Sequence, residues 1–277
     1  MAANDAQVKV APTPSVVSYD SILLHHGTLT PRAFLLLHGL TASPRQFEAF
    51  GQMLYERGAN VYIPRLPRHG LTDRLTTQLE DLTADELRTF AERSAAYAAS
   101  LGERLVTVGF SVGGLLSAWI AQHLPIERSV SIAPFLGVAW IPDRFNAHAA
   151  RLALRAPNHF WWWHPLLREG LMPAHGYPRV ATHAIAHAAA LGAELLEDAG
   201  RDAPAARDIH VVLNARESTV NNSRARRLAR RWAGHRASGV GLHRIRGLPA
   251  SHDIIEPLRL KGVVQHVYPA LLDLVDR

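Results

Sequence analysis

Residues Arg104 to Leu124, RLVTVGFSVGGLLSAWIAQHL, decide the fold of this chain. The stretch Arg104–Val108, mostly apolar and rich in valine after its first residue, predicts a buried strand, and Val112–Leu124 predicts a helix that follows it almost at once. A Gly-x-Ser-x-Gly pattern centred on Ser111 falls between the two. A turn this tight crowds the positions two before and two after the serine, so glycine is needed at both. Ser111 is therefore expected at the carboxyl edge of a sheet, where α/β proteins bind ligands. The alternative is a glycine-rich turn with an incidental serine.

Strands and helices alternate along most of the remaining chain. The helix expected at Thr83–Leu101 opens with a capping box made by Thr83 and Glu86. The other expected strands are Ala33–Leu37, Val61–Ile63, Ser129–Ala133, Ile209–Leu213 and Val240–Arg246, and the other expected helices are Pro44–Gly58, Asn221–Ala233 and Glu256–Val275. This order predicts an α/β fold with a doubly wound, mostly parallel sheet.

The alternation stops between Pro134 and about Ala206. This stretch shows several short helical pieces and no convincing strand. It is therefore interpreted as an insertion into a single core, which consists of residues 1–133 and 209–277.

The composition is that of one globular domain. The 277 residues are 48% hydrophobic, which is enough to bury one sizeable core. No run of eighteen apolar residues occurs, so no membrane span is expected, and the N-terminus lacks the layout of a signal peptide, which predicts a cytoplasmic protein. Without cysteine, neither disulfides nor thiolate metal sites can form.

The positive charge raises the question of a polyanion partner. The net charge is +6, and five arginines gather between Arg224 and Arg231. Apolar residues interleave with them at helical spacing, which places most of these arginines on the outer face of an amphipathic helix. No nucleic-acid-binding module accompanies them, so no nucleic-acid partner is expected.

A serine hydroxyl becomes a good nucleophile only when a base accepts its proton. Of the sixteen histidines, His252 lies in a loop after the last expected strand, again at the carboxyl edge of the sheet. Chain order and loop position therefore make His252 the expected general base; a histidine on a surface loop is the alternative.

The third member should be a carboxylate that orients the imidazole, in the chain order serine, acid, histidine. Glu217 follows the strand Ile209–Leu213 and fits this order. Asp208 precedes that strand and would lie at its wrong end, while Asp253 adjoins the histidine and would have to double back. Glu217 is the expected acid, with an ordinary exposed loop glutamate as the alternative.

Acyl transfer also needs donors for the developing oxyanion, usually two backbone N–H groups. One is expected from Val112, the residue after the nucleophile, at the positive end of its helix. The other is expected from Leu40, in the loop after the first buried strand. An ordinary glycine turn at the end of that strand is the alternative.

Five motifs, in the right order over nearly the whole chain, resemble those of bacterial carboxylesterases and monoacylglycerol lipases of the α/β-hydrolase superfamily. They are LLLHGLTASP (35–44), PRLPRHG (64–70), GFSVGG (109–114), NARESTVNN (214–222) and LPASHDIIEP (248–257). The resemblance implies a nucleophile at Ser111, a base at His252 and oxyanion donors at Leu40 and Val112. It implies an acid at Glu217, where the family usually has aspartate.

The resemblance also implies that the insertion, residues 134–208, is a helical cap over the site. Aromatic side chains of the cap would then line an apolar pocket for an uncharged substrate, although each could equally serve to pack the cap on the sheet. The expected pocket residues are Phe135, Trp140, Trp161, Trp162 and Trp163.

These features predict a hydrolase of small-molecule carboxylic esters that works through an acyl-enzyme. The same triad could instead act on an amide, a thioester, a lactone or a carbon–carbon bond, and a non-catalytic ligand-binding relative is a further alternative. No cofactor is expected, because no glycine-rich phosphate loop occurs. No metal is expected either: His183 and His187 lie four residues apart, but no third ligand accompanies them.

Overall fold

The structure is a computed structural model that describes residues 19–164, 166–168, 172–236, 239–258 and 263–276. Residues 1–18, which lack the layout of a signal peptide, lie outside the described residues. Among the residues described, no helix is both long and apolar enough to cross a membrane.

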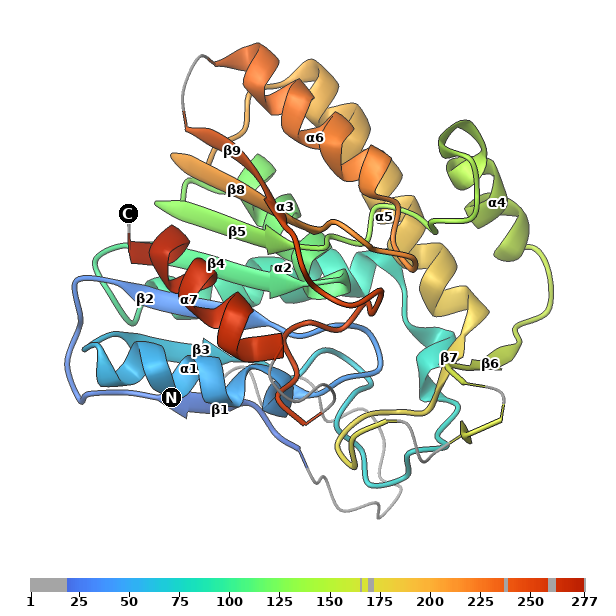
Figure 1. Ribbon diagram of the computed structural model, residues 1–277, viewed down its shortest axis with the longest axis horizontal. Helices are drawn as coiled ribbons and strands as arrows, with labels where there is room; N and C mark the ends of the chain where they lie inside the picture. The colour runs from blue at the N-terminus through green and yellow to red at the C-terminus, as the bar shows by residue number, and fades with distance from the viewer. Residues whose placement is uncertain (1–18, 165, 169–171, 237–238, 259–262, 277) are drawn as a thin grey trace.

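A seven-stranded sheet forms the centre of the molecule (Figure 1). Its strands are β1 (Ile22–Leu24), β2 (Ala33–Leu37), β3 (Asn60–Ile63), β4 (Leu105–Phe110), β5 (Arg128–Ile132), β8 (Asp208–Asn214) and β9 (Val240–Ile245). They lie in the order β1-β3-β2-β4-β5-β8-β9, and only β1 pairs antiparallel. The doubly wound, mostly parallel sheet predicted from the sequence is confirmed.

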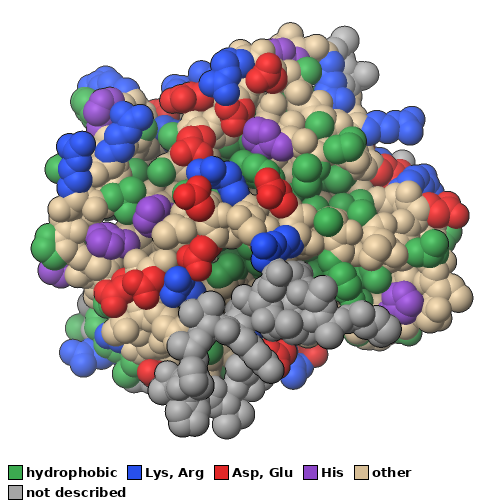
Figure 2. All heavy atoms as spheres, turned by 180° about the vertical axis from the view of Figure 1, so that it is seen from behind, with side chains coloured by type: hydrophobic (Ala, Val, Ile, Leu, Met, Phe, Trp, Pro, Cys, Tyr) green, Lys and Arg blue, Asp and Glu red, His purple; other side chains and the backbone are tan. Residues whose placement is uncertain are grey.

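Helices cover both faces of this sheet. The helices are α1 (Glu48–Glu56), α2 (Ala84–Ala99), α3 (Val112–His123), α5 (Thr182–Arg201), α6 (Asn222–His235) and α7 (Val263–Asp276), and the 3-10 turns η2 (Pro44–Phe47) and η3 (Gln78–Asp81) precede α1 and α2. In Figure 1, α1 and α7 lie in front of the sheet, and α2 and α3 lie behind it. The capping box of Thr83 and Glu86 is present at the start of α2. Figure 2, which views the molecule from behind, shows acidic and basic side chains intermixed over that face.

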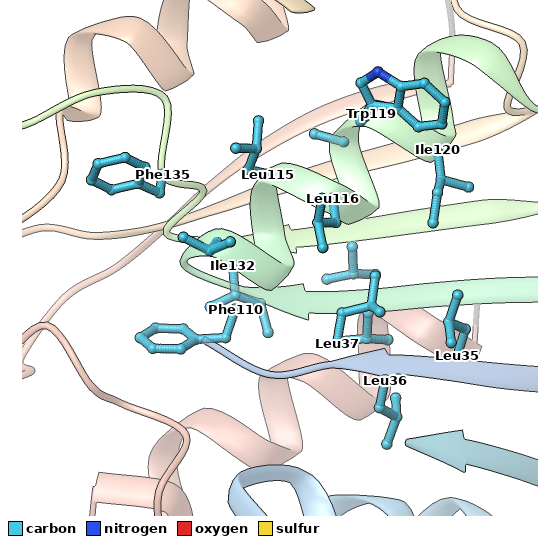
Figure 3. Close-up of a cluster of buried hydrophobic side chains, with 14 of the residues drawn as sticks. Leu35, Leu36, Leu37, Phe110, Leu115, Leu116, Trp119, Ile120, Ile132 and Phe135 are labelled. Atoms are coloured by element: carbon cyan, nitrogen blue, oxygen red, sulfur yellow. The ribbon is translucent and has the colours of Figure 1, made fainter. Parts of the chain in front are cut away.

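The most deeply buried elements are those that carry Ser111. All residues of β2, β4 and β5 are buried, and so is every residue of α3 from Val112 to Gln122. Figure 3 shows Leu115, Leu116 and Ile120 of α3 on the side of the sheet toward which Leu35 and Leu37 of β2 point, while Leu36 points to the opposite side. Each fully buried aliphatic side chain stabilises the fold by about 1.5–3 kcal/mol, so this centre is the rigid support of the site.

The insertion contains more strand than the sequence suggested. It holds η4 (Asp143–Phe145), α4 (Asn146–Ala153), the antiparallel pair β6 (Phe160–Trp162) and β7 (Arg179–Ala181), and α5. The expectation of no strand was therefore wrong for β6 and β7, because strands of three residues are too short to show an alternating pattern. The helix α5 packs against both α3 and α6. The division into core and cap stays a prediction.

The last helix begins later than expected. Residues 256–258 are not helical, and the described part of α7 is Val263–Asp276, whereas the apolar pattern suggested a start at Glu256. Proline at position 257 disfavours a helical conformation of the residue before it. Glu256 instead lies buried beside His175, with Oε2 of Glu256 3.0 Å from Nε2 of His175.

Candidate functional site

The turn that carries Ser111 is as tight as its glycines require. Ser111 has φ 56° and ψ −115°, an unusual conformation for a residue with a side chain. A Cβ atom on Gly109 would lie 2.0 Å from the carbonyl oxygen of Gly113, and one on Gly113 would lie 1.9 Å from the carbonyl oxygen of Leu37. Only glycine fits at either position, so the pattern exists to hold Ser111 in this strained turn.

Ser111, His252 and Glu217 form a continuous chain of hydrogen-bonding contacts. Oγ of Ser111 lies 2.8 Å from Nε2 of His252, and Nδ1 of His252 lies 2.9 Å from Oε2 of Glu217. The three side chains come from the loops after β4, β8 and β9, which all end at the carboxyl edge of the sheet. The ring of His252 also packs on Phe110, with ring centroids 4.8 Å apart. The structure thus brings these three predicted residues together.

Glu217 is held as a charged group. Its side chain is fully buried, and Oε1 accepts hydrogen bonds from the N–H groups of Ser218 and Thr219 at 2.9 and 2.7 Å. Burial alone would raise the pKa of Glu217. The contact with His252 and the backbone donors outweigh burial, so the pKa of Glu217 is lowered from its ordinary value. The carboxylate can therefore stabilise a protonated His252.

The two alternative acids, Asp208 and Asp253, form hydrogen bonds with other partners. Asp208 lies at the start of β8 and accepts a 2.8 Å hydrogen bond from Nε of Arg128. Asp253 accepts from Nε2 of Gln46 at 2.9 Å, and its other oxygen accepts from the N–H of Ile255 at 3.1 Å. Both carboxylates thus have partners other than the imidazole of a catalytic histidine, in agreement with the preference for Glu217.

Asn214 is a residue of the site that the sequence reasoning missed. It ends β8 and is fully buried. Its Nδ2 donates to the carbonyl oxygens of Pro249 and Ser251, at 3.1 and 2.9 Å, and so fixes the loop that precedes His252. Asn214 lies 35 and 37 positions before these partners in the chain, and no spacing pattern predicts contacts over such separations.

The two expected oxyanion donors are available. Val112 begins α3 directly after the nucleophile, and Leu40 lies in the turn that follows β2. Within the described part of the chain, no hydrogen bond uses the N–H of Leu40 or of Val112. Neither group thus has an acceptor among the described residues, as an oxyanion donor beside Ser111 requires.

Two buried histidines support the turn that contains Leu40. Nε2 of His38 accepts from the N–H of Leu66 at 3.1 Å, and Nε2 of His69 accepts from the N–H of Thr41 at 3.0 Å. Burial lowers the pKa of His69 to about 4, and burial together with the neighbouring His69 lowers the pKa of His38 well below its ordinary value. Both rings are thus neutral at pH 7, with the proton on Nδ1.

A buried amide links this turn to the loop of His252. Oε1 of Gln46 accepts from the N–H of Gly39 at 2.8 Å, while its Nε2 donates to Asp253. Gln46 and Asp253 are 207 positions apart, so the sequence gives no sign of the link.

The expected pocket residues lie in different surroundings. Phe135 is buried, and its N–H donates to the carbonyl oxygen of Ser111 at 2.9 Å. Nε1 of Trp163 donates to Oγ1 of Thr41 at 2.8 Å, while Trp162 lies half-buried in β6, 5.5 Å from the guanidinium of Arg168. Trp140 and Trp161 expose 70% and 55% of their surface. The assignment of all five to a pocket stays a prediction.

No group of three or more His, Cys, Asp or Glu side chains suited to a metal ion occurs among the described residues. His183, one of the pair considered from the sequence, contacts the carbonyl oxygen of Ala156 through Nε2 at 2.9 Å.

Comparison with solved structures gives the same fold. This chain is similar to the structure reported for LipS and LipT, two metagenome-derived lipolytic enzymes. The match covers 94% of this chain and 98% of the other, with 18% identity and a TM-score of 0.69. It is also similar to the monoacylglycerol lipase of Paleococcus ferrophilus, with 16% identity over 92% of this chain and 96% of the other and a TM-score of 0.69. A soluble variant of monoglyceride lipase from Saccharomyces cerevisiae, crystallised with a substrate analogue, has 16% identity over 97% of both chains and a TM-score of 0.63.

Sequence comparison identifies the family. No curated protein gives a significant match. The sequence profile of the alpha/beta hydrolase family, however, matches residues 34–257, which is most of the chain and includes every residue of the site described above. The fold and the family resemblance predicted from the sequence are therefore confirmed, and this chain belongs to the alpha/beta hydrolase family.

Proposed function

We propose that this protein is a serine hydrolase that cleaves carboxylic esters through an acyl-enzyme intermediate. The observation that carries the proposal is the unbroken contact from Ser111 through His252 to Glu217, with distances of 2.8 and 2.9 Å. Nucleophile, base and orienting acid must be aligned in this way for a serine hydroxyl to attack a carbonyl carbon.

The proposed reaction uses each of these groups in turn. Oγ of Ser111 attacks the ester carbonyl while Nε2 of His252 takes its proton, and Glu217 stabilises the imidazolium that results. The carbonyl oxygen becomes an oxyanion that accepts from the N–H groups of Leu40 and Val112. His252 then returns the proton to the leaving alcohol, and a water molecule, activated by the same ring, releases the acid from Ser111.

We infer that the substrate is an apolar ester. Buried Phe135 adjoins the nucleophile, and the expected cap carries the three tryptophans at positions 161–163, of which Trp161 and Trp163 expose 55% and 36% of their surface. Similar structures include lipolytic enzymes and monoacylglycerol lipases. We therefore assign the protein to the carboxylesterase and lipase type of enzyme (EC 3.1.1), with an uncharged small-molecule or acylglycerol-like substrate.

The test is hydrolysis of p-nitrophenyl esters from acetate to palmitate, with Ser111→Ala as the matched blank. Turnover by the wild type should fall by several orders of magnitude in Ser111→Ala, while the circular dichroism spectrum stays the same. A loss of tenfold or less would contradict nucleophilic catalysis by Ser111.

A set of amino-acid p-nitroanilides in the same assay separates the alternatives. Turnover of anilides without turnover of esters would replace the ester assignment by an amide one. Inactivity on both sets would also overturn the ester proposal, in favour of another bond or a non-catalytic role.

A further inference from the structure

Thr41 adopts a backbone conformation that threonine rarely takes. Its φ is 66°, in the left-handed region, where a β-branched side chain is strained. Thr41 is the third residue of a turn that the N–H of Ala42 closes by donating to the carbonyl oxygen of Gly39 at 3.1 Å. Leu40, the second residue, has no positive φ, so this is a type II turn, which requires the third residue to be left-handed. The turn therefore keeps its shape only while Thr41 is held in this strained conformation.

All three polar groups of Thr41 are bound. Its N–H donates to Nε2 of His69 at 3.0 Å, and its carbonyl oxygen accepts from the N–H of Tyr177 at 2.7 Å. Its hydroxyl oxygen accepts from Nε1 of Trp163 at 2.8 Å. Two of these three partners, Trp163 and Tyr177, belong to the segment inserted between β5 and β8. Contacts from this segment thus hold the strained residue in place.

The shape of this turn sets the direction in which the N–H of Leu40 points. The peptide between Gly39 and Leu40 is planar and trans, so its N–H points away from its C=O. The carbonyl oxygen of Gly39 is fixed by two donors, the N–H of Ala42 at 3.1 Å and Nδ1 of His38 at 2.9 Å. If Thr41 left the left-handed region, the Ala42 donor would be lost and the Gly39–Leu40 peptide could rotate.

We propose that Trp163 is a positioning residue for the oxyanion site, which it orients through Thr41 and the Gly39–Ala42 turn. The inference rests on the proposed function, because it assumes that the N–H of Leu40 receives the oxyanion. It makes the inserted segment part of the catalytic apparatus: the indole N–H of Trp163, by holding Thr41, keeps Leu40 in its reactive orientation.

The test is a double-mutant cycle across this one hydrogen bond. Trp163→Phe removes the donor and Thr41→Val removes the acceptor, while Thr41→Ser keeps the hydroxyl and serves as the conservative variant. Trp232→Phe is the matched control, because it also loses an indole hydrogen bond, from Nε1 to Oε1 of Gln122 at 2.7 Å, between α6 and α3. The quantities measured are kcat and KM for an ester that the wild type cleaves, and the rate at which a fluorophosphonate modifies Ser111.

We expect Trp163→Phe and Thr41→Val each to lower kcat and the modification rate about three- to tenfold, with KM changed less than twofold. The double variant should lose no more than either single variant, because both remove the same bond. Thr41→Ser should stay close to the wild type, and Trp232→Phe should leave kcat unchanged.

Three results would overturn the inference: an unchanged kcat in Trp163→Phe, an effect confined to KM, or losses that multiply in the double variant. These three results concern the variants alone. If the fluorophosphonate modifies Ser111 of the wild type, the proposed function stands whichever of them is found. A wild type whose Ser111 does not react with the fluorophosphonate would overturn the proposed function, and the inference with it.

Discussion

Oε2 of Glu217 lies 2.9 Å from Nδ1 of His252, although 35 positions separate the two residues in the chain. Glu217 is also bonded to backbone N–H groups of its own loop, which hold the carboxylate at this distance. A glutamate is one methylene longer than the aspartate that the family resemblance implies at this position, and Glu217 contacts His252 with its longer side chain.

Removal of the charge of Glu217 should reveal its part in catalysis. Glu217→Gln keeps the size of the side chain but cannot stabilise a protonated His252, so we expect kcat to fall by roughly 10³- to 10⁴-fold. Glu217→Asp keeps the charge and should retain more activity than Glu217→Gln. Equal activity of Glu217→Gln and the wild type in steady-state ester hydrolysis would show that another group orients His252.

The glycine at position 113 should tolerate no side chain. Because a Cβ there would lie 1.9 Å from the carbonyl oxygen of Leu37, Gly113→Ala should lower the free energy of unfolding by at least about 3 kcal/mol. Gly234→Ala, in α6, is the matched control: its Cβ meets no atom within 4 Å, and we expect a gain of roughly 0.5–1 kcal/mol. Urea unfolding measures both changes, and similar values for the two variants would refute this account of the turn.

His69 should make the fold sensitive to acid. Burial lowers the pKa of His69 from 6.5 to about 4, so between these values the unfolded chain binds a proton that the folded chain does not. Stability therefore rises with pH in this window and is lost as pH falls from 6.5 to 4, by about 3 kcal/mol at 1.36 kcal/mol per pKa unit. In His69→Gln this part of the pH dependence should vanish. Parallel curves of unfolding free energy against pH for the two proteins would argue against a neutral, buried His69.

The sequence predicted those parts of the molecule whose determinants are local. Buried strands such as Ala33–Leu37 are continuous apolar runs, and the capping box at Thr83 marks the start of α2. The glycines around Ser111 point to one particular turn. Chain order and strand ends were enough to predict that Ser111, Glu217 and His252 lie together, because parallel strands end at a common edge.

The sequence could not predict contacts that depend on the packing of distant segments. His69 holds Thr41 across 28 positions, and Trp163 does so across 122. Most of the arginines between Arg224 and Arg231 were expected on the outer face of their helix, but the pattern did not tell which one would be buried. Arg224 is buried and bonded to Asp143, 81 positions away. Each such partner is one of many of its residue type, and only the folded chain selects it.

The most direct test of the central claim is to find which serine reacts with a fluorophosphonate, by mass spectrometry of the digested protein. Ser43 provides an internal comparison, since it also contacts a histidine, with Oγ 3.1 Å from Nδ1 of His175, but it is fully buried. The account predicts a single adduct on Ser111 that is lost in His252→Ala. An unmodified protein, or an adduct on Ser43 or another serine, would contradict it.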